Sequence, residues 1–278
     1  MSPSIIISTY NSPVWLEKVL WGYQCQTHQD FSLIIADDGS GEETRDLIVK
    51  YQELFSQKIT HVWHEDKGFE KCAILNKAIQ QSQSDYLIFT DGDCVPKWDF
   101  VEQHLSLAEE GVFLSGGYCK LPMALSKSLT KENITNRDAF NVRWLKAQGL
   151  RKKSSLFKLG LSPTTSKLAD YLTPTKATWN GCNASTWKEY LIAVNGHNEV
   201  MKYGGEDREM GMRLINKGIK AKQIRNRALS VHLDHSRGYA TPESVAANVV
   251  IREHTESSGA IWTEEGIVKG PKPDCSID

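Results

Sequence analysis

The sequence lacks several features that would place it at once in a common class of protein. It has no Gly-x-x-x-x-Gly-Lys-Ser/Thr or Gly-x-Gly-x-x-Gly motif, the loops with which P-loop enzymes and dinucleotide-binding domains hold phosphate. Its six cysteines form no Cys-x-x-Cys pair, which argues against a zinc ribbon or a redox motif. No run approaches the roughly 20 apolar residues that a membrane-spanning helix needs, and the N-terminus has no signal-peptide pattern. We therefore expect a cytoplasmic protein.

The chain also lacks an excess of charge of either sign. Its 278 residues include 33 Lys and Arg against 34 Asp and Glu, a formal net charge of -1, so we expect no nucleic-acid partner. The balance is uneven, because residues 120–178 contain twelve basic and three acidic residues, a net +9. Apolar residues are interleaved with these charges. We expect a basic, helical insertion that is either simply solvated or faces an anionic surface.

The first part of the chain alternates between short apolar runs and amphipathic segments. We expect strands at 4–10, 31–36, 59–63 and 85–90, and helices at 14–23, 42–56 and 72–81. The runs are too apolar to be half exposed, which predicts an α/β fold with a central, mostly parallel sheet flanked by helices. In such sheets ligands bind beyond the carboxyl ends of the strands.

Polar residues follow three of the expected strands. They are Ser8, Thr9 and Tyr10, then Asp37 and Asp38, then Asp91, Gly92 and Asp93. Asp and Gly are common in turns for conformational reasons alone, but three strand ends that converge on one crevice favour a site. Because hard carboxylate oxygens suit Mg²⁺ or Mn²⁺, the 91–93 element predicts a divalent cation that could neutralise the phosphates of a nucleotide.

Together with the sequence of 5–11 and 35–40, this Asp-Gly-Asp element resembles the family 2 glycosyltransferases of GT-A fold. Segments 180–185, 204–214 and 232–237 resemble the catalytic region of the β-1,4-galactosyltransferases and polypeptide N-acetylgalactosaminyltransferases. The resemblance implies an inverting, metal-dependent transfer of a sugar, such as Gal or GalNAc, from a UDP-sugar to a glycan acceptor in bacterial surface polysaccharide synthesis.

The resemblance also suggests how the chain is organised. One GT-A domain would cover 1–240, and a C-terminal helix and tail would cover 241–278. Within the domain we expect a nucleotide-binding half at 1–119, the basic insertion at 120–178 and an acceptor and catalytic half at 179–240. Residues 164–178, rich in Thr, Ser, Pro and Lys, are expected to form a mobile loop beside the acceptor cleft.

On the nucleotide side, the resemblance assigns Asp93 to the metal and Asp91 to the ribose or the metal shell. Asp38 would read the uracil edge, with Asp37 beside it. Lys71 would approach the diphosphate, where the family often has Arg. The remaining residues expected to line the nucleotide-sugar are Ser8, Thr9, Tyr10 and Gly92.

On the acceptor side, the resemblance makes Asp207 the general base and Glu206 an acceptor ligand. An acidic pair also simply favours the positive end of a helix, here expected at 208–217. Small residues before the pair would let the acceptor approach the backbone. The other expected acceptor contacts are Gly204, Gly205, Tyr203, Trp179 and Asn183.

Two histidines complete the expected metal site. His235 matches a metal-binding histidine of the galactosyltransferases, and His232 stands where those enzymes have a thioether ligand. We expect Mn²⁺, with Mg²⁺ as the alternative, although imidazole also admits Zn²⁺.

The expected partners are a UDP-sugar donor and a glycan or lipid-linked glycan acceptor. The insertion would allow peripheral contact with anionic lipid on the inner face of the membrane. One alternative is a sugar-1-phosphate nucleotidyltransferase, which would have a Gly-rich loop where this chain has Tyr10-Asn-Ser-Pro13. The other is a non-catalytic carbohydrate-binding protein, which would not need Asp93, Asp207 and His235 together.

Overall fold

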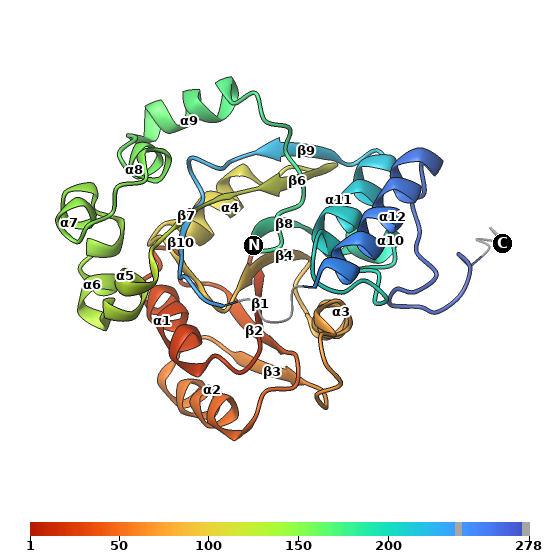
Figure 1. Cartoon of the computed structure of the whole chain (residues 1–278), viewed down its shortest axis with the longest axis horizontal. Helices are drawn as coiled ribbons and strands as arrows, with labels where there is room; N and C mark the ends of the chain where they lie inside the picture. The colour runs from red at the N-terminus through yellow and green to blue at the C-terminus, as the bar shows by residue number, and fades with distance from the viewer. Residues whose placement is uncertain (237–240, 274–278) are drawn as a thin grey trace.

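The computed structural model describes residues 1–236 and 241–273. Its centre is a seven-stranded sheet in the order β3-β2-β1-β4-β8-β6-β9, flanked by helices (Figure 1). The strands are β1 (Ser4–Thr9), β2 (Ser32–Asp37), β3 (Ile59–Trp63), β4 (Tyr86–Asp91), β6 (Val112–Ser115), β8 (Asn183–Trp187) and β9 (Lys220–Gln223). All neighbours pair in parallel except β8, which is antiparallel to β4 and β6. The predicted mostly parallel sheet is confirmed.

The helices expected at 14–23, 42–56, 72–81 and 208–217 are present as α1 (Pro13–Gln24), α2 (Glu42–Leu54), α3 (Lys71–Gln81) and α11 (Glu206–Asn216). In addition, α4 (Phe100–Leu107) and α10 (Lys188–Ala193) lie between strands. Helix α1 has Ser12 as its N-cap residue and Pro13 in its first turn, where a missing N–H costs nothing.

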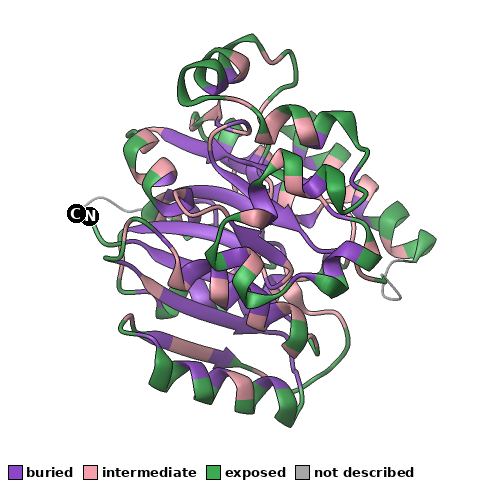
Figure 2. Ribbon diagram, turned by 90° about the vertical axis from the view of Figure 1, so that its left-hand side faces the viewer, coloured by how far each residue is buried: buried purple, intermediate pink, exposed green. Residues whose placement is uncertain are grey.

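Side chains alternate across the central strands and build two cores. Ile5 and Ile7 of β1 pack in the same cluster as Leu16 of α1, whereas Ile6 packs on the other face with Ile74 of α3 and Met210 of α11. Figure 2 shows the central strands buried, an outer strand partly exposed, and the outer faces of the helices exposed. Because both faces are covered, the carboxyl-terminal edge of the sheet is left to form a site.

A second sheet has three short strands in the order β5-β10-β7. They are β5 (Cys94–Pro96), β7 (Gly117–Lys120) and β10 (Leu229–His232). Antiparallel pairing sets His232 opposite Cys94, and the N–H of Leu233 donates to the carbonyl of Asp93 at 2.8 Å. The small sheet thus brings the Asp-Gly-Asp element and the histidine segment together across more than a hundred residues of sequence.

Segment 120–178 is helical, as expected. It contains α5 (Met123–Ser128), α6 (Lys131–Thr135), the 3-10 helix η1 (Asp138–Phe140), α7 (Val142–Ala147), α8 (Lys153–Leu159) and α9 (Pro163–Leu172). It is more than a solvated appendage, because Leu125, Leu145 and Leu150 join the α1 core. The mobile loop expected at 164–178 is wrong for most of its length: α9 begins there, with a capping box between Ser162 and Thr165.

Helix α12 (Pro242–Ser258) follows the second sheet and lies against α11 (Figure 1). The amide of Asn216 donates to the carbonyl oxygens of Thr255 and Ala260 at 3.1 and 2.9 Å. No helix in the described residues is both long and apolar enough to cross a membrane. Two residues used in the sequence interpretation, Arg237 and Cys275, lie outside the described residues.

Candidate active site

Lys71, the first residue of α3, lies at the end of β4. Its Nζ is 2.7 Å from Oδ1 of Asp91, and Ser8 Oγ donates to the same oxygen at 2.6 Å. Burial alone would lower the pKa of Lys71, but the carboxylates of Asp91, Glu206 and Asp207 raise it well above its usual value. The nucleotide side and the acceptor side of the predicted site therefore meet around one ammonium group.

Asp93 forms the centre of a cluster with the two histidines. Its Oδ2 is 2.8 Å from Nε2 of His235 and 3.7 Å from Nε2 of His232, and the two imidazole rings are stacked with centroids 5.8 Å apart. Burial tends to raise the pKa of Asp93, but the hydrogen bond from His235 and the charges of both histidines lower it below its usual value.

The orientation of both imidazoles fits a metal site. Nδ1 of His232 donates to the carbonyl of Leu233, and Nδ1 of His235 donates to the carbonyl of Ser236, each at 2.8 Å. Because Nδ1 of each ring donates to a backbone carbonyl, loss of the proton on Nε2 would leave the Nε2 lone pair as the ligand that faces the Asp93 carboxylate. This donor set, one carboxylate and two imidazoles, fits a divalent transition-metal ion.

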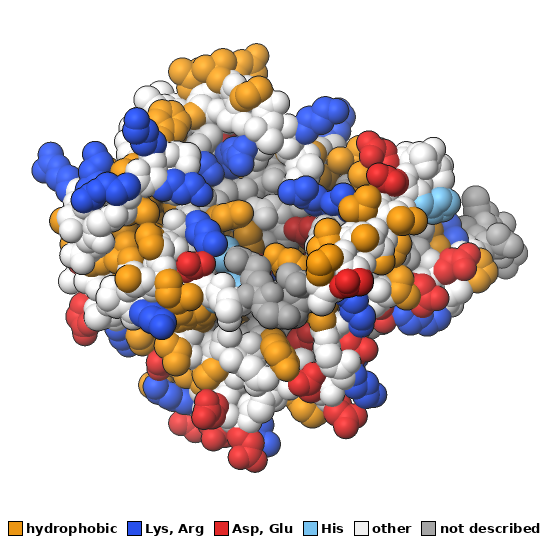
Figure 3. All heavy atoms as spheres, viewed as in Figure 1, with side chains coloured by type: hydrophobic (Ala, Val, Ile, Leu, Met, Phe, Trp, Pro, Cys, Tyr) orange, Lys and Arg blue, Asp and Glu red, His pale blue; other side chains and the backbone are white. Residues whose placement is uncertain are grey.

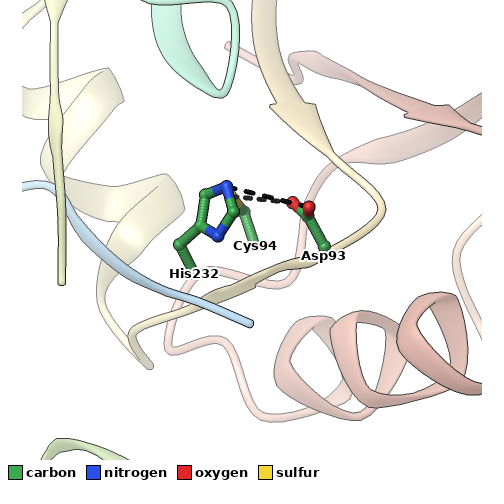
Figure 4. Close-up of side chains that lie close together, drawn as sticks. All are labelled: Asp93, Cys94 and His232. Carbon is green, nitrogen blue, oxygen red and sulfur yellow. Dashed lines mark hydrogen bonds and ion pairs between the residues drawn. The ribbon is translucent and has the colours of Figure 1, made fainter. Parts of the chain in front are cut away.

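Cys94 is a further group at this cluster, and sequence reasoning did not single it out. Its Sγ donates to Oδ1 of Asp93 at 3.3 Å, and ligand atoms of Asp93, Cys94 and His232 lie within 4.8 Å of one another (Figure 4). Burial raises the pKa of the Cys94 thiol well above its usual value. Its place immediately after Asp93 was the one signal that could have drawn attention to it.

The acidic pair opens helix α11 after two glycines in left-handed conformation. Gly204 has φ 120° and Gly205 φ 94°, angles that other residues rarely adopt. Glu206 Oε2 accepts from the N–H of Gly204 at 2.9 Å, and Asp207 Oδ2 accepts from the N–H of Gly181 at 3.0 Å. Burial, followed by the charge of Asp207, raises the pKa of Glu206.

Both carboxylates of the Asp37-Asp38 turn make hydrogen bonds within the protein, which the sequence interpretation did not expect. Asp37 is fully buried, and its carboxylate accepts from the N–H of Ser40 at 2.9 Å and contacts His61 Nε2 at 2.8 Å. Direct contact between Asp37 and a nucleotide is therefore not supported, because its side chain is completely buried. Asp38 is 6% exposed; its oxygens contact His64 Nε2 at 2.8 Å and the N–H of Glu70 at 3.0 Å.

The end of β1 lies over the same edge. Tyr10 is 44% exposed, and its hydroxyl donates to Asp66 Oδ2 at 2.8 Å. Thr9 Oγ1 is buried without a hydrogen-bond partner among the described residues. Gly92 packs closely here, since a Cβ on it would lie 3.0 Å from the Ser8 carbonyl oxygen.

Two residues expected to contact the acceptor belong to the interior instead. Trp179 is 1% exposed and packs edge-on against Phe89, with ring centroids 5.3 Å apart, so its face is closed to a sugar. Asn183 is fully buried. Its amide donates to the carbonyls of Gly117 and Ala228 at 2.8 and 3.0 Å, which joins the large sheet to the small one.

Tyr203 stays at the surface beside the double glycine. Its ring packs against Phe69 in a T-shaped arrangement, with centroids 6.2 Å apart. Phe69 precedes α3, so this contact links the acceptor segment to the loop that carries Lys71.

A buried histidine that sequence reasoning missed holds two polar side chains of β8 in the interior. His104 of α4 donates from Nε2 to Asn183 Oδ1 at 2.9 Å and contacts Ser185 Oγ through Nδ1 at 2.7 Å. Burial lowers its pKa to about 4. Nothing in the local sequence around His104 indicates this contact, because its partners are some eighty residues away.

The chain matches two family models. Residues 4–150 match the model of glycosyl transferase family 2, and residues 167–236 match a model described as the N-terminal domain of galactosyltransferase. A chondroitin synthase from Escherichia coli is 26% identical over 247 residues, which cover 82% of this chain and 34% of the synthase. An uncharacterized glycosyltransferase, YfnE, from Bacillus subtilis is 25% identical over 90% of this chain and 69% of its own length.

A second chondroitin synthase, from Pasteurella multocida, has only 23% of its length matched, so this chain corresponds to a part of both synthases. Among solved structures, S. aureus TarS superposes with a TM-score of 0.59 at 16% identity, over 93% of this chain and 41% of TarS. The mannosyltransferase PcManGT from Pyrobaculum calidifontis, in complex with GDP-Man and Mn²⁺, gives a TM-score of 0.57 at 19% identity, over 93% of this chain and 62% of PcManGT. These likenesses confirm the GT-A fold, and the match over more than half of its length shows that the chain belongs to glycosyl transferase family 2.

Proposed function

We propose that this protein is an inverting, metal-dependent glycosyltransferase that moves a sugar from a UDP-sugar to a glycan acceptor in the synthesis of a bacterial surface polysaccharide. The observation that carries the proposal is the meeting of three groups at one sheet edge: the Asp93–histidine cluster, Lys71 with Asp91, and the Glu206-Asp207 pair. A site built only to hold a sugar needs neither the first nor the last.

The relatives support this reading of the site. Two are named as chondroitin synthases, enzymes that build a polysaccharide. A TarS fragment has been solved with UDP-GlcNAc, and PcManGT with GDP-Man and Mn²⁺. We keep UDP as the nucleotide and Gal or GalNAc as the sugar, because the second half of the chain matches a galactosyltransferase model.

The donor would lie along the carboxyl ends of β1, β2 and β4. Tyr10 and Asp38 contact the base, and Asp91 and Ser8 lie toward the ribose. Lys71 provides the positive charge for the diphosphate. Asp93, His232 and His235 would hold a divalent cation, which would supply positive charge to stabilise the departing diphosphate.

Asp207 acts as the general base. As the acceptor oxygen attacks the anomeric carbon, the carboxylate of Asp207 takes its proton, and the bond between that carbon and the diphosphate oxygen breaks to release UDP. The N–H groups of Gly181 and Arg208 donate to the two Asp207 oxygens at 3.0 and 2.7 Å, and thereby fix its orientation. Glu206 and Tyr203 position the acceptor beside it.

The decisive assay is a panel of UDP-sugars tested for hydrolysis and transfer with Mn²⁺, Mg²⁺ or a chelator. We expect release of UDP that depends on the cation and is lost in Asp93→Ala, and a product whose anomeric configuration, read by NMR, is opposite to that of the donor. Release of pyrophosphate from UTP and a sugar 1-phosphate would instead favour a nucleotidyltransferase. Retained cation dependence in Asp93→Ala would contradict the metal assignment.

We also propose that the α8–α9 surface contacts anionic lipid. Its exposed apolar side chains include Phe157, Leu168 and Leu172, which are 61%, 56% and 65% exposed, and they line one open groove together with Lys153 and Lys158. Figure 3 shows Lys and Arg side chains gathered over the α7–α8 side of the molecule and apolar side chains over α9. An apolar face bordered by cations is complementary to an anionic lipid surface.

A further inference from the structure

A small basic pocket lies beside the candidate active site. Its Lys158 also lines the α8–α9 groove, but none of the roles given above uses the pocket itself. It has a volume of about 180 Å³ and lies between α8, β7 and the segment after β9; its lining includes Lys152, Lys158, Arg225, Tyr118, Asn180 and Ser155. Three of these residues are cationic. Among the described residues that line it, none is acidic.

The cations of this pocket are not balanced from within. Nε of Arg225 is buried and has no hydrogen-bond partner among the residues that the structure describes. Asp170 is an acid whose charge acts on Lys158, but it is already paired. Its carboxylate lies 2.7 Å from Nε of Arg227 and accepts from the amide of Asn226 at 3.0 Å. A buried guanidinium N–H without an acceptor is costly, and an anion would satisfy it.

The surroundings of Lys158 show the same excess of positive charge. Burial is the main cause that lowers its pKa, and the charge of Cys119 opposes this effect. The charges of Arg225 and Lys152 lower the pKa further, against a smaller opposing effect of Asp170. Within the described part of the chain, Nζ of Lys158 has one hydrogen-bond acceptor, the backbone carbonyl of Tyr118 at 3.5 Å. An anion placed among the three cations would relieve their repulsion.

The position of the pocket relates it to the transferred sugar and the acceptor. On one side, the ring of Tyr118 lies 5.4 Å from that of His232, in the Asp93 cluster. On the other side, Asn180 precedes Gly181, whose N–H donates to Asp207. The pocket therefore adjoins the proposed metal ligands through Tyr118 and the segment that orients the proposed base through Asn180.

We infer that this pocket, centred on Arg225 with Lys152 and Lys158, is a subsite for an anionic group of the acceptor, either the carboxylate of a uronic acid or a phosphate. Arg225 offers a planar fork of donors that matches either group, and the two lysines supply further charge. Binding of the anion follows from the pocket alone. Its assignment to the acceptor rests on the proposed function.

The test measures binding rather than turnover. Its result can therefore be interpreted even if the proposed glycosyltransferase function is wrong. The probes are a disaccharide ending in glucuronate, its counterpart ending in glucose, and the glucose-ended disaccharide carrying a phosphate. Each is titrated by calorimetry into the whole protein, with and without UDP and Mn²⁺. We expect at least one acidic probe to bind about tenfold more tightly than the neutral one, and the tighter of the two identifies the source of the anion.

Arg225→Gln should abolish this preference, and Lys152→Gln, at an exposed position that the fold tolerates, should reduce it. The matched control is Lys153→Ala, which removes an adjacent charge that lies outside the pocket. Equal binding of all three probes, or a preference that survives Arg225→Gln in a folded protein, would overturn the subsite. Loss of the preference when UDP and Mn²⁺ are present would show that the pocket serves the donor diphosphate and would overturn the assignment to the acceptor.

Discussion

The ammonium group of Lys71 lies 2.7 Å from Oδ1 of Asp91, an oxygen that Ser8 also contacts at 2.6 Å. Lys71 begins α3, whereas Asp91 ends β4, so the pair joins two elements at the edge where a donor would enter. The charge of Lys71 is balanced by Asp91, Glu206 and Asp207. A diphosphate bound here would contact a lysine whose ammonium group is already positioned by protein carboxylates.

Replacement of Lys71 by Met should weaken UDP binding. Removing one charge-assisted contact costs about 1.5–3 kcal/mol, equivalent to roughly 10- to 100-fold in the dissociation constant. Titration calorimetry with UDP and Mn²⁺ measures the effect. Lys50→Met is the matched control, because Lys50 pairs with Glu17 on the distant α1–α2 surface. Equal affinities for wild type and Lys71→Met would contradict a diphosphate role.

Asp207→Asn should bind the donor normally and fail in transfer. The amide is nearly isosteric with the carboxylate but cannot accept the acceptor proton, and general-base catalysis contributes roughly 10²- to 10⁴-fold to the rate. Single-turnover transfer and UDP affinity are measured on the same preparation. Asp46→Asn, an exposed change on α2, should leave both unchanged. Turnover by Asp207→Asn at the wild-type rate would assign the base elsewhere.

The free energy of unfolding should fall as the pH is lowered from about 6.5 to about 4. In the folded protein, burial lowers the pKa of His104 to about 4 and that of His197 to about 3, whereas an unfolded histidine titrates near 6.5. The unfolded chain therefore binds protons that the folded chain excludes. For His104 alone the loss approaches about 3 kcal/mol at the acid end of this range.

Urea unfolding at several pH values tests this expectation. His104→Gln should lower the stability at pH 7, since its contacts with Asn183 and Ser185 change, yet its acid slope should be shallower. His254→Gln, exposed on α12, should keep the wild-type slope. An unchanged slope in His104→Gln would mean that His104 is not neutral in the folded protein.

Binding to vesicles should depend on the α8–α9 surface. Each basic residue near an anionic membrane contributes about 1 kcal/mol, so neutralising Lys153 and Lys167 together should weaken binding to phosphatidylglycerol vesicles by roughly 30-fold. Phe157→Ser should weaken it further by removing an apolar contact. Leu54→Ser, an exposed apolar change on α2, is the control. Co-sedimentation that none of these changes affects would leave this surface without a role in lipid binding.

Much of the first half could be predicted because its signals are local. The alternation of apolar runs with amphipathic segments located β1 to β4 and α1 to α3 to within a few residues, and polar strand ends indicated the site edge. Helix α9 also carried a local signal, the Ser162-Pro163 start of a helix, which its loop-like composition outweighed.

The errors concern residues whose roles depend on partners far along the chain. Asn183 was expected to contact the acceptor, but its amide donates to the carbonyl oxygens of Gly117 and Ala228. No local sequence pattern distinguishes an asparagine that binds a ligand from one that binds the backbone. Trp179 packs against Phe89 in the interior, and the local sequence does not indicate this contact either. The strands of the small sheet have only three or four residues, too few for any periodicity to indicate them.

Gly92 is the one residue between Asp91, which ends a strand of the large sheet, and Asp93, which precedes a strand of the small one. Its N–H donates to the Ser8 carbonyl at 2.7 Å, and a Cβ there would lie 3.0 Å from the same oxygen. The main chain that joins the two aspartates therefore turns a tight corner at Gly92. If a nucleotide-sugar binds here as proposed, this corner has the same span for every donor, so selection among donors would depend on the residues around it.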